Sequence, residues 1–201
     1  RLAQPYSGAQ YGIHFPSHKG TEMVLACVDG DPNKPLGLGT VPNANTISPV
    51  VSNNKHQSVI RTAGGNEIVI SDEDAKQKIW LTTKGKHMIQ QDDENKCIFI
   101  ESTDHNKLLI DDKNELSEWN AKTHKITMTY KSGSEGIVIT TGGGNVIKID
   151  DKNKILTIKT NGGHQIDMDD QGKKILLKDG QGKNKVTLDG NGGLILDSQG
   201  K

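Results

Sequence analysis

From residue 66 onward, pairs of aliphatic residues separated by one residue recur along the chain, at intervals of about ten residues where the repeat is regular. Alternation with a period of two predicts short β-strands, and the Asn, Asp, Gly and Lys residues between the pairs predict turns. No window keeps apolar residues at helical spacing for three turns, so we expect an all-β chain. The residues predicted to face inward are Ile68, Ile70, Ile79, Leu81, Ile98, Ile100, Leu108, Ile110, Ile126, Met128, Ile137, Ile139, Ile147, Ile149, Leu156, Ile158, Ile166, Met168, Ile175, Leu177, Val186, Leu188, Leu194 and Leu196.

Strands this short cannot bury a hydrophobic face alone, so we expect the repeats to stack on their neighbours. Two architectures satisfy the periodicity, which leaves both open. In one, a single chain coils into a β-helix with three faces per coil. In the other, three chains wind together, each gives one strand to each face in turn, and the apolar pairs meet on a shared axis.

Composition divides the chain into two parts. All six prolines fall within the first 49 residues, and none follows. Because a proline inside a sheet removes a ladder hydrogen bond, its absence fits a stack of mostly interior strands. The change predicts one domain over residues 1–58 and a repetitive domain over residues 59–201.

The formal net charge is zero and the mean hydropathy is −0.62, so the chain lacks the basic excess of a nucleic-acid-binding protein. No apolar run approaches the ~18 residues that a membrane-spanning helix needs. Cys27 and Cys97 are far apart in the sequence and in unlike surroundings, so we expect two reduced cysteines rather than a disulfide or a metal site.

The histidines do not predict a metal site. Pro16 lies between His14 and His18 and argues against a helix that would align the two rings. Four others are expected at corners or flanks of the repeats, where solvated polar residues belong; in a trimer, copies of them brought to the axis are an alternative site for an ion. These four are His87, His105, His124 and His164.

The acidic doublets invite comparison with calcium-binding repeats, but they follow the apolar pairs, and the chain lacks regularly spaced GGxGxD turns. We therefore expect these aspartates to accept backbone hydrogen bonds at the ends of strands. The glycine-rich segment Thr141–Asn145 is expected to be a corner, because no helix follows it and it lacks the Lys-Ser/Thr of a P-loop. The doublets are Asp92-Asp93, Asp111-Asp112, Asp150-Asp151 and Asp169-Asp170.

One segment, "ELSEWNAKTH" over residues 115–124, breaks the alternation and places Trp119 where a smaller aliphatic residue would be expected. We expect an exposed or half-packed tryptophan at a slipped register. A bulged corner and a ligand-contacting loop are the alternatives.

The first 49 residues predict a small β domain. "GTEMVLACVDGDP" contains a strand over residues 23–26 followed by a turn over residues 29–32, and "PLGLGTVPNANTISPV" gives a second short strand with a polar exit.

Together with the repeats, the phrases "AQPYSGAQYGIHFPSHKGTEMVL" and "DGDPNKPLGLGTVPNANTISPVVSNNKHQSVIRTAGGNEIVISD" closely resemble the VgrG spike proteins of bacterial type VI secretion systems. That family is similar in turn to the tail spikes of contractile phages. The resemblance implies a partial OB-type barrel (an oligonucleotide/oligosaccharide-binding fold) followed by an intertwined triple-stranded β-helix in a homotrimer. It implies a secreted, cell-puncturing needle that delivers effectors. From the residues themselves we expect no enzyme activity, metal or cofactor.

The resemblance also implies partners: an Hcp-type tube protein behind the spike, a PAAR-type tip-capping protein, effectors, and the target-cell membrane that is penetrated. Assembly in the cytoplasm would precede delivery outside the cell or into the target cell. The family's larger N-terminal base is missing from these residues, so we expect this chain alone not to assemble on a tube. The alternatives are a phage-like tail fibre or adhesin, and a polysaccharide-binding or -cleaving β-helix. The cleaving form is disfavoured because the aromatic residues Trp80, Phe99, Trp119 and Tyr130 are dispersed.

Overall fold

The computed structural model describes residues 1–199 and divides the chain into two compact units, one over residues 1–55 and one that begins at His56. Both units are built from β-strands. Within the described residues the helical segments are two single 3-10 turns, Val28–Gly30 and Ser52–Asn54. The domain boundary predicted after residue 58 falls inside strand β5 (Gln57–Arg61).

The first unit contains two separate two-stranded antiparallel sheets. Strand β1 (Tyr6–Ser7) pairs with β2 (Gly12–Ile13), and β3 (Glu22–Cys27) pairs with β4 (Pro35–Val41). Strands β3 and β4 confirm the two strands predicted from the sequence. The register of β3 shifts between Val24 and Leu25, which marks a β-bulge.

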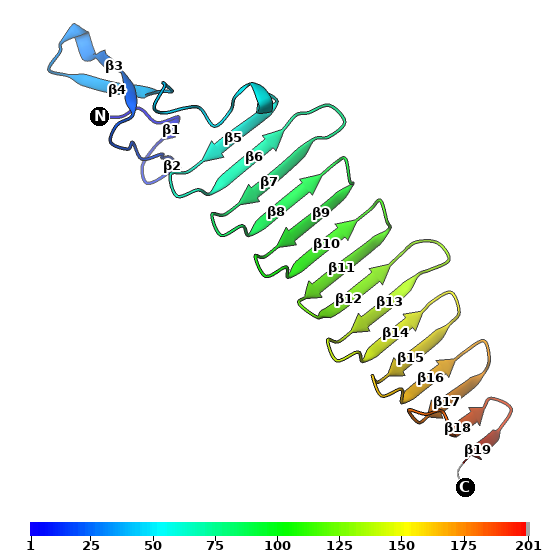
Figure 1. The fold of residues 1–201 in the computed structure, drawn as a ribbon. Coiled ribbons are helices and arrows are strands. Elements are labelled where there is room, and N and C mark those ends of the chain that lie inside the picture. Colours follow the sequence, from blue (N-terminus) through cyan, green and yellow to red (C-terminus); the bar gives the residue numbers. More distant parts are fainter. Residues whose placement is uncertain (200–201) are drawn as a thin grey trace. The chain divides into compact units, whose positions relative to one another are not determined.

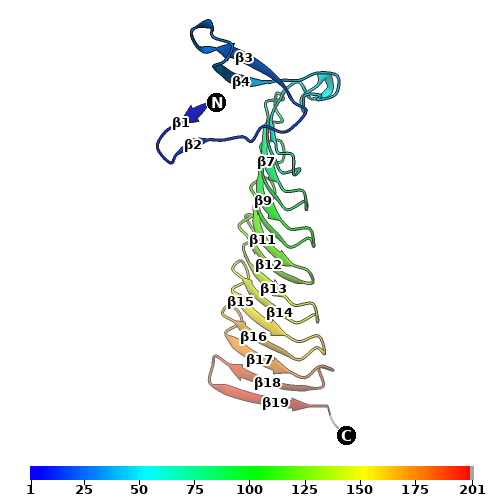
Figure 2. The same ribbon diagram turned by 90° about the vertical axis from the view of Figure 1, so that its left-hand side faces the viewer.

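The second unit is one sheet of fifteen strands, β5 to β19, in which consecutive strands pair antiparallel and β5 and β19 form the two edges (Figure 1). The view in Figure 2 shows that these strands form a single twisted layer. The strands after β5 are β6 (Glu67–Ser71), β7 (Lys78–Thr82), β8 (Met88–Asp92), β9 (Cys97–Glu101), β10 (Lys107–Asp111), β11 (Leu116–Ala121), β12 (His124–Thr129), β13 (Gly136–Thr140), β14 (Val146–Asp150), β15 (Ile155–Lys159), β16 (Gln165–Asp169), β17 (Lys174–Lys178), β18 (Asn184–Asp189) and β19 (Gly193–Ser198).

This topology differs from both architectures considered for the sequence. Consecutive strands of one chain pair directly with each other, so the chain neither coils into a three-faced β-helix nor sends successive strands to different faces of an intertwined trimer. The connections explain the difference. They are two to six residues long, and connections of this length join antiparallel neighbours as hairpins.

The turns alternate between the two sides of the sheet and form two rows. We call the turns after the odd-numbered strands β5 to β17 the first turn row, and those after the even-numbered strands β6 to β18 the second turn row.

A Thr-centred turn recurs in the first turn row. The N–H of Thr62 donates to the carbonyl of Asn66, 2.9 Å away, and the N–H of Gly65, at φ 85°, donates back to the carbonyl of Thr62. The same pair of hydrogen bonds closes the turns at Thr83, Thr141 and Thr160.

Positive φ in the turns is not confined to glycine. In the second turn row the left-handed position is held by Lys96, Glu115, Lys154 and Lys173. Such a conformation costs an L-residue roughly 1–2 kcal/mol. The turns therefore tolerate a local strain that the flanking ladder must offset.

Candidate functional site

The predicted inward-facing residues all lie on one face of the sheet, because cross-strand partners point to the same side. They form two columns that run the length of the sheet. One column passes through Ile139, Ile147 and Ile158, which oppose each other in turn, and the other through Ile137, Ile149 and Leu156. We call this surface the apolar face. It consists of the 24 predicted residues together with Ser58, Ile60, Ile89, Gln91, Ser117 and Trp119, which complete the columns in β5, β8 and β11.

Nothing in the described part of the second unit covers the apolar face. Ile147 is 40% exposed and Ile110 is 44% exposed, although both lie in the interior of the sheet. Most of their neighbours in the two columns are similarly exposed. Contiguous apolar surface of this extent is rare on a soluble monomer and marks an interaction surface.

The opposite face of the sheet is the better covered one. Val69 is 3% exposed and is the only apolar side chain among residues 1–199 that is buried. It lies in the central column of that face, beside Trp80 of the next strand. Gln90 separates Trp80 from Phe99 in the same column, and Lys107 lies 4.6 Å from the centre of the Phe99 ring. The ammonium group of Lys107 thus covers the Phe99 ring on this face.

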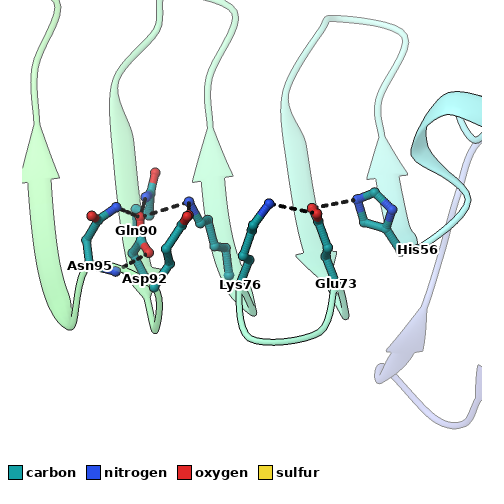
Figure 3. Close-up of polar contacts among 8 residues, drawn as sticks. His56, Glu73, Lys76, Gln90, Asp92 and Asn95 are labelled. Atoms are coloured by element: carbon teal, nitrogen blue, oxygen red, sulfur yellow. Dashed lines mark hydrogen bonds and ion pairs between the residues drawn. The ribbon is translucent and has the colours of Figure 1, made fainter.

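Polar contacts tie neighbouring strands together beside the second turn row (Figure 3). Asp92 is 4% exposed and accepts hydrogen bonds from the backbone N–H and side-chain amide of Asn95, each at 3.0 Å. Gln90 donates to the same carboxylate at 3.0 Å, and Lys78 of the adjacent strand lies 3.2 Å from it. Lys78 also pairs with Glu94 at 2.8 Å.

These contacts set the charge state of Asp92. Burial raises the pKa of the Asp92 carboxyl, but the hydrogen bonds from Asn95 and the ammonium group of Lys78 outweigh it and hold that pKa below its usual value. The carboxylate is therefore ionised and fully committed to the turn, which leaves it no free role as a general acid.

The prediction for the acidic doublets is confirmed at the first aspartate of each pair. The carboxylate of Asp111 accepts from the backbone N–H and side-chain amide of Asn114, and Asp150 accepts in the same way from Asn153. At Asp169 the donor is the N–H of Gly172. The first aspartate of each doublet thus closes a turn.

The four histidines expected at corners or flanks of the repeats lie there. His87, His105, His124 and His164 are exposed in or beside the first turn row. Within residues 1–199 no three His, Cys, Asp or Glu side chains come close enough together to hold a metal ion. Cys27 and Cys97 are free thiols, as predicted, and burial raises the pKa of the Cys97 thiol. No helix within those residues has the length and apolar character to cross a membrane.

The expected slipped register around Trp119 is wrong. Strand β11 is in register with both neighbours, and Trp119 lies between Leu108 and Ile126 in one apolar column. Its side chain is 59% exposed, because nothing covers the face on which it lies. The other position of the pair is Ser117, opposite Ile110.

The sequence pattern missed three strands of the sheet: β5, β8 and β11. Each has one polar residue in its inward pair, namely Ser58, Gln91 and Ser117. A search for one aliphatic or aromatic residue with a polar partner, at the same interval and bounded by turns, would have found all three. All three polar residues lie in the same apolar column and interrupt it without breaking the ladder, whereas the other column is apolar throughout.

The sequence similarity of this chain to its VgrG relatives covers less than half of it. No protein-family model matches. Over 87 residues the chain is 30% identical to the type VI secretion system spike protein VgrG3 of Vibrio cholerae serotype O1 (strain El Tor Inaba N16961). The matched segment covers 40% of this chain and 9% of VgrG3. It is also 30% identical over 87 residues to the actin cross-linking toxin VgrG1 of Vibrio cholerae serotype O1 (strain O395), with 40% and 8% coverage. The relation to VgrG proteins is partial and distant.

The chain therefore spans less than a tenth of the length of these VgrG relatives. Among solved structures, the G-box domain of the microcephaly protein CPAP matches with a TM-score of 0.36 and 12% identity, over 72% of this chain and 99% of that domain. The TCP10 domain of Danio rerio CPAP matches with a TM-score of 0.26 and 12% identity, over 71% of this chain and all of that domain.

Proposed function

We propose that three copies of this chain pack their apolar faces around a common axis and form the needle of a type VI secretion spike. The observation that carries the proposal is the apolar face, which runs the length of the sheet and which the described part of the second unit leaves uncovered. Burying the exposed part of each aliphatic side chain would contribute roughly 1 kcal/mol, and the two columns repeat that contribution along the whole sheet.

Each copy would form one complete face of a three-sided prism. This replaces the intertwined trimer expected from the sequence, because the strands of one chain already pair with each other. Three is the number implied by the resemblance to VgrG spikes, and the partial similarity to a spike protein of Vibrio cholerae supports it. Two copies packed face to face would cover the same surface and are the main competing assembly.

The proposed role is mechanical rather than enzymatic. The ladder hydrogen bonds run along the long axis of the sheet, so each would bear part of an axial load. Fourteen strand intervals at ~4.8 Å give a length of about 67 Å. The first unit would belong to the end of an OB-type barrel. The tube protein, tip-capping protein, effectors and penetrated membrane are proposed partners, and secretion is the proposed destination.

The mass of the assembly in solution tests the proposal. Light scattering should give about three times the chain mass of 21.8 kDa, and the complex should resist detergent on an unboiled denaturing gel. A monomer with full β-sheet circular dichroism, or a stable dimer, would contradict the trimeric needle.

A further inference from the structure

The two turn rows of the sheet carry opposite charge, most strongly over residues 61–125. Six basic residues and three acidic ones lie in the first turn row or at the strand ends beside it: Arg61, Lys84, Lys86, Lys107, Lys122 and Lys125 against Glu67, Glu101 and Asp104. Nine acidic residues and four basic ones lie in the second turn row or beside it: Asp72, Glu73, Asp74, Asp92, Asp93, Glu94, Asp111, Asp112 and Glu115 against Lys76, Lys78, Lys96 and Lys113.

Part of this charge is already neutralised within the chain. Lys78 pairs with Asp92 and Glu94, and Arg61 pairs with Glu67. In contrast, several exposed side chains have no ion-pair partner among residues 1–199. They include Lys84, Lys86 and Lys122 of the first turn row and Asp74, Asp93 and Glu115 of the second turn row.

The charge difference matters once the apolar faces turn toward a common axis. If all copies run in the same direction, rotation about that axis brings the first turn row of each copy beside the second turn row of the next, as in any head-to-tail ring. If one copy runs in the opposite direction across a face-to-face pair, each turn row meets its own kind instead. The first arrangement joins unlike charges, and the second joins like charges.

We propose that the oppositely charged turn rows are a self-recognition surface that aligns copies of this chain in parallel and closes the ring. This inference rests on the proposed trimer and adds the contact that orients it. A ring closed by rotation places corresponding strands at the same height. Lys84 and Lys86, between β7 and β8, then lie opposite the neighbour's second-row turns before β7 and after β8, which contain Asp74 and Asp93.

The apolar face alone does not specify orientation, because two columns of aliphatic side chains fit against each other in either direction. Complementary charge in the two turn rows selects the parallel orientation, because the antiparallel orientation brings like charges together. The effect depends on ionic strength, because exposed charges are screened over about 10 Å at 0.1 M salt. Salt therefore distinguishes this contact from the apolar one.

Charge reversal tests the proposal with three variants of the full chain. The first carries Lys84→Glu, Lys86→Glu and Lys122→Glu, which makes both turn rows acidic. The second carries Asp74→Lys, Asp93→Lys and Glu115→Lys, which makes both rows basic. The third carries all six substitutions, so that the rows are opposite again with their signs exchanged. Each is unfolded in urea and reassembled at low (~0.02 M) and high (~0.5 M) salt, and the trimer yield is measured by light scattering.

We expect each single-row variant to lose about tenfold in trimer yield at low salt and to recover at high salt. The six-substitution variant should assemble like the wild type at low salt, which no loss of local contacts would explain. A wild-type trimer whose assembly responds neither to salt nor to any reversal would overturn the role of the turn rows alone. A monomeric wild-type chain would overturn both that role and the proposed needle.

Discussion

At the scale of single residues, the turns of the second unit depend on aspartates that end strands. Asp92, Asp111 and Asp150 each accept the backbone N–H and the side-chain amide of an asparagine three residues later. The second aspartate of each doublet does not take part in this pair of bonds. Sequence alone predicted that the doublets close turns, but it did not show which member does so, because both are acceptors of the same kind.

The adjacent residues Asp92 and Asp93 test this division. We expect Asp92→Ala to lower the free energy of unfolding by about 1–3 kcal/mol, because Lys78, Gln90 and Asn95 all lose the same acceptor. The matched variant Asp93→Ala, at an exposed position, should change it by less than about 0.5 kcal/mol. Urea unfolding measures both values. Equal effects of the two substitutions would contradict the assignment.

The same carboxylates predict a dependence of stability on pH. Hydrogen bonds from Asn114 hold the pKa of Asp111 below its usual value, and those from Lys148 and Asn153 do the same for Asp150. A carboxyl group with a lowered pKa in the folded state stabilises the fold above its unfolded pKa of about 3.9, and this stabilisation is lost as the pH falls through the folded value.

We therefore expect the melting temperature to be steady from neutral pH down to about pH 5 and to fall below about pH 4. Thermal unfolding by circular dichroism across this range is the measurement. Asn114→Ala removes the side-chain donor to Asp111 and should reduce the drop. A melting temperature that is the same at both ends of the range would exclude this role for the turn carboxylates.

At the scale of strands, alternation predicted twelve of the fifteen strands of the sheet and the side chains that share a face. It failed for β5, β8 and β11, because a serine or glutamine replaces one member of the apolar pair. It could not identify the neighbours of each strand. A period of two shows which side chains of a strand share a face. The partners of a strand depend instead on the connections, and the short connections of this chain indicate hairpins between consecutive strands.

The apolar face is tested by a charge placed in its centre. Ile147→Asp should prevent assembly, because every copy would bring an unpaired carboxylate to the same height on the axis, where burial of a charge is costly. The control is Lys159→Gln, an exposed position on the opposite face of the next strand, which adds no negative charge to the first turn row and should assemble normally. Light scattering reports the mass of each variant. A trimer of wild-type thermal stability from Ile147→Asp would exclude the needle.

At the scale of the whole sheet, stability is distributed along the ladder. Each interior strand pairs with the strand before and the strand after it, so contacts are close in sequence and the structure extends without long-range connections. Up to residue 199 this sheet buries one apolar side chain, Val69, and has no second layer of the kind on which most domains depend. The stability of this sheet therefore depends on the association that would bury its apolar face. The polar residues Gln91 and Ser117 interrupt that face.

The recurrent Thr-centred turns have a further consequence, which concerns length. The turns at Thr141 and Thr160 have the same hydrogen bonds and lie in the same row, and β14 and β15 lie between them. Deleting residues 141–159 would join β13 to the second of these turns and bring Ile139 opposite Ile166. The shortened sheet should lose about 10 Å and still assemble, as small-angle scattering would show; failure to assemble would mean that the strands are not interchangeable. Duplication or loss of one hairpin in the gene would thus change the length of the sheet in fixed steps of about 10 Å.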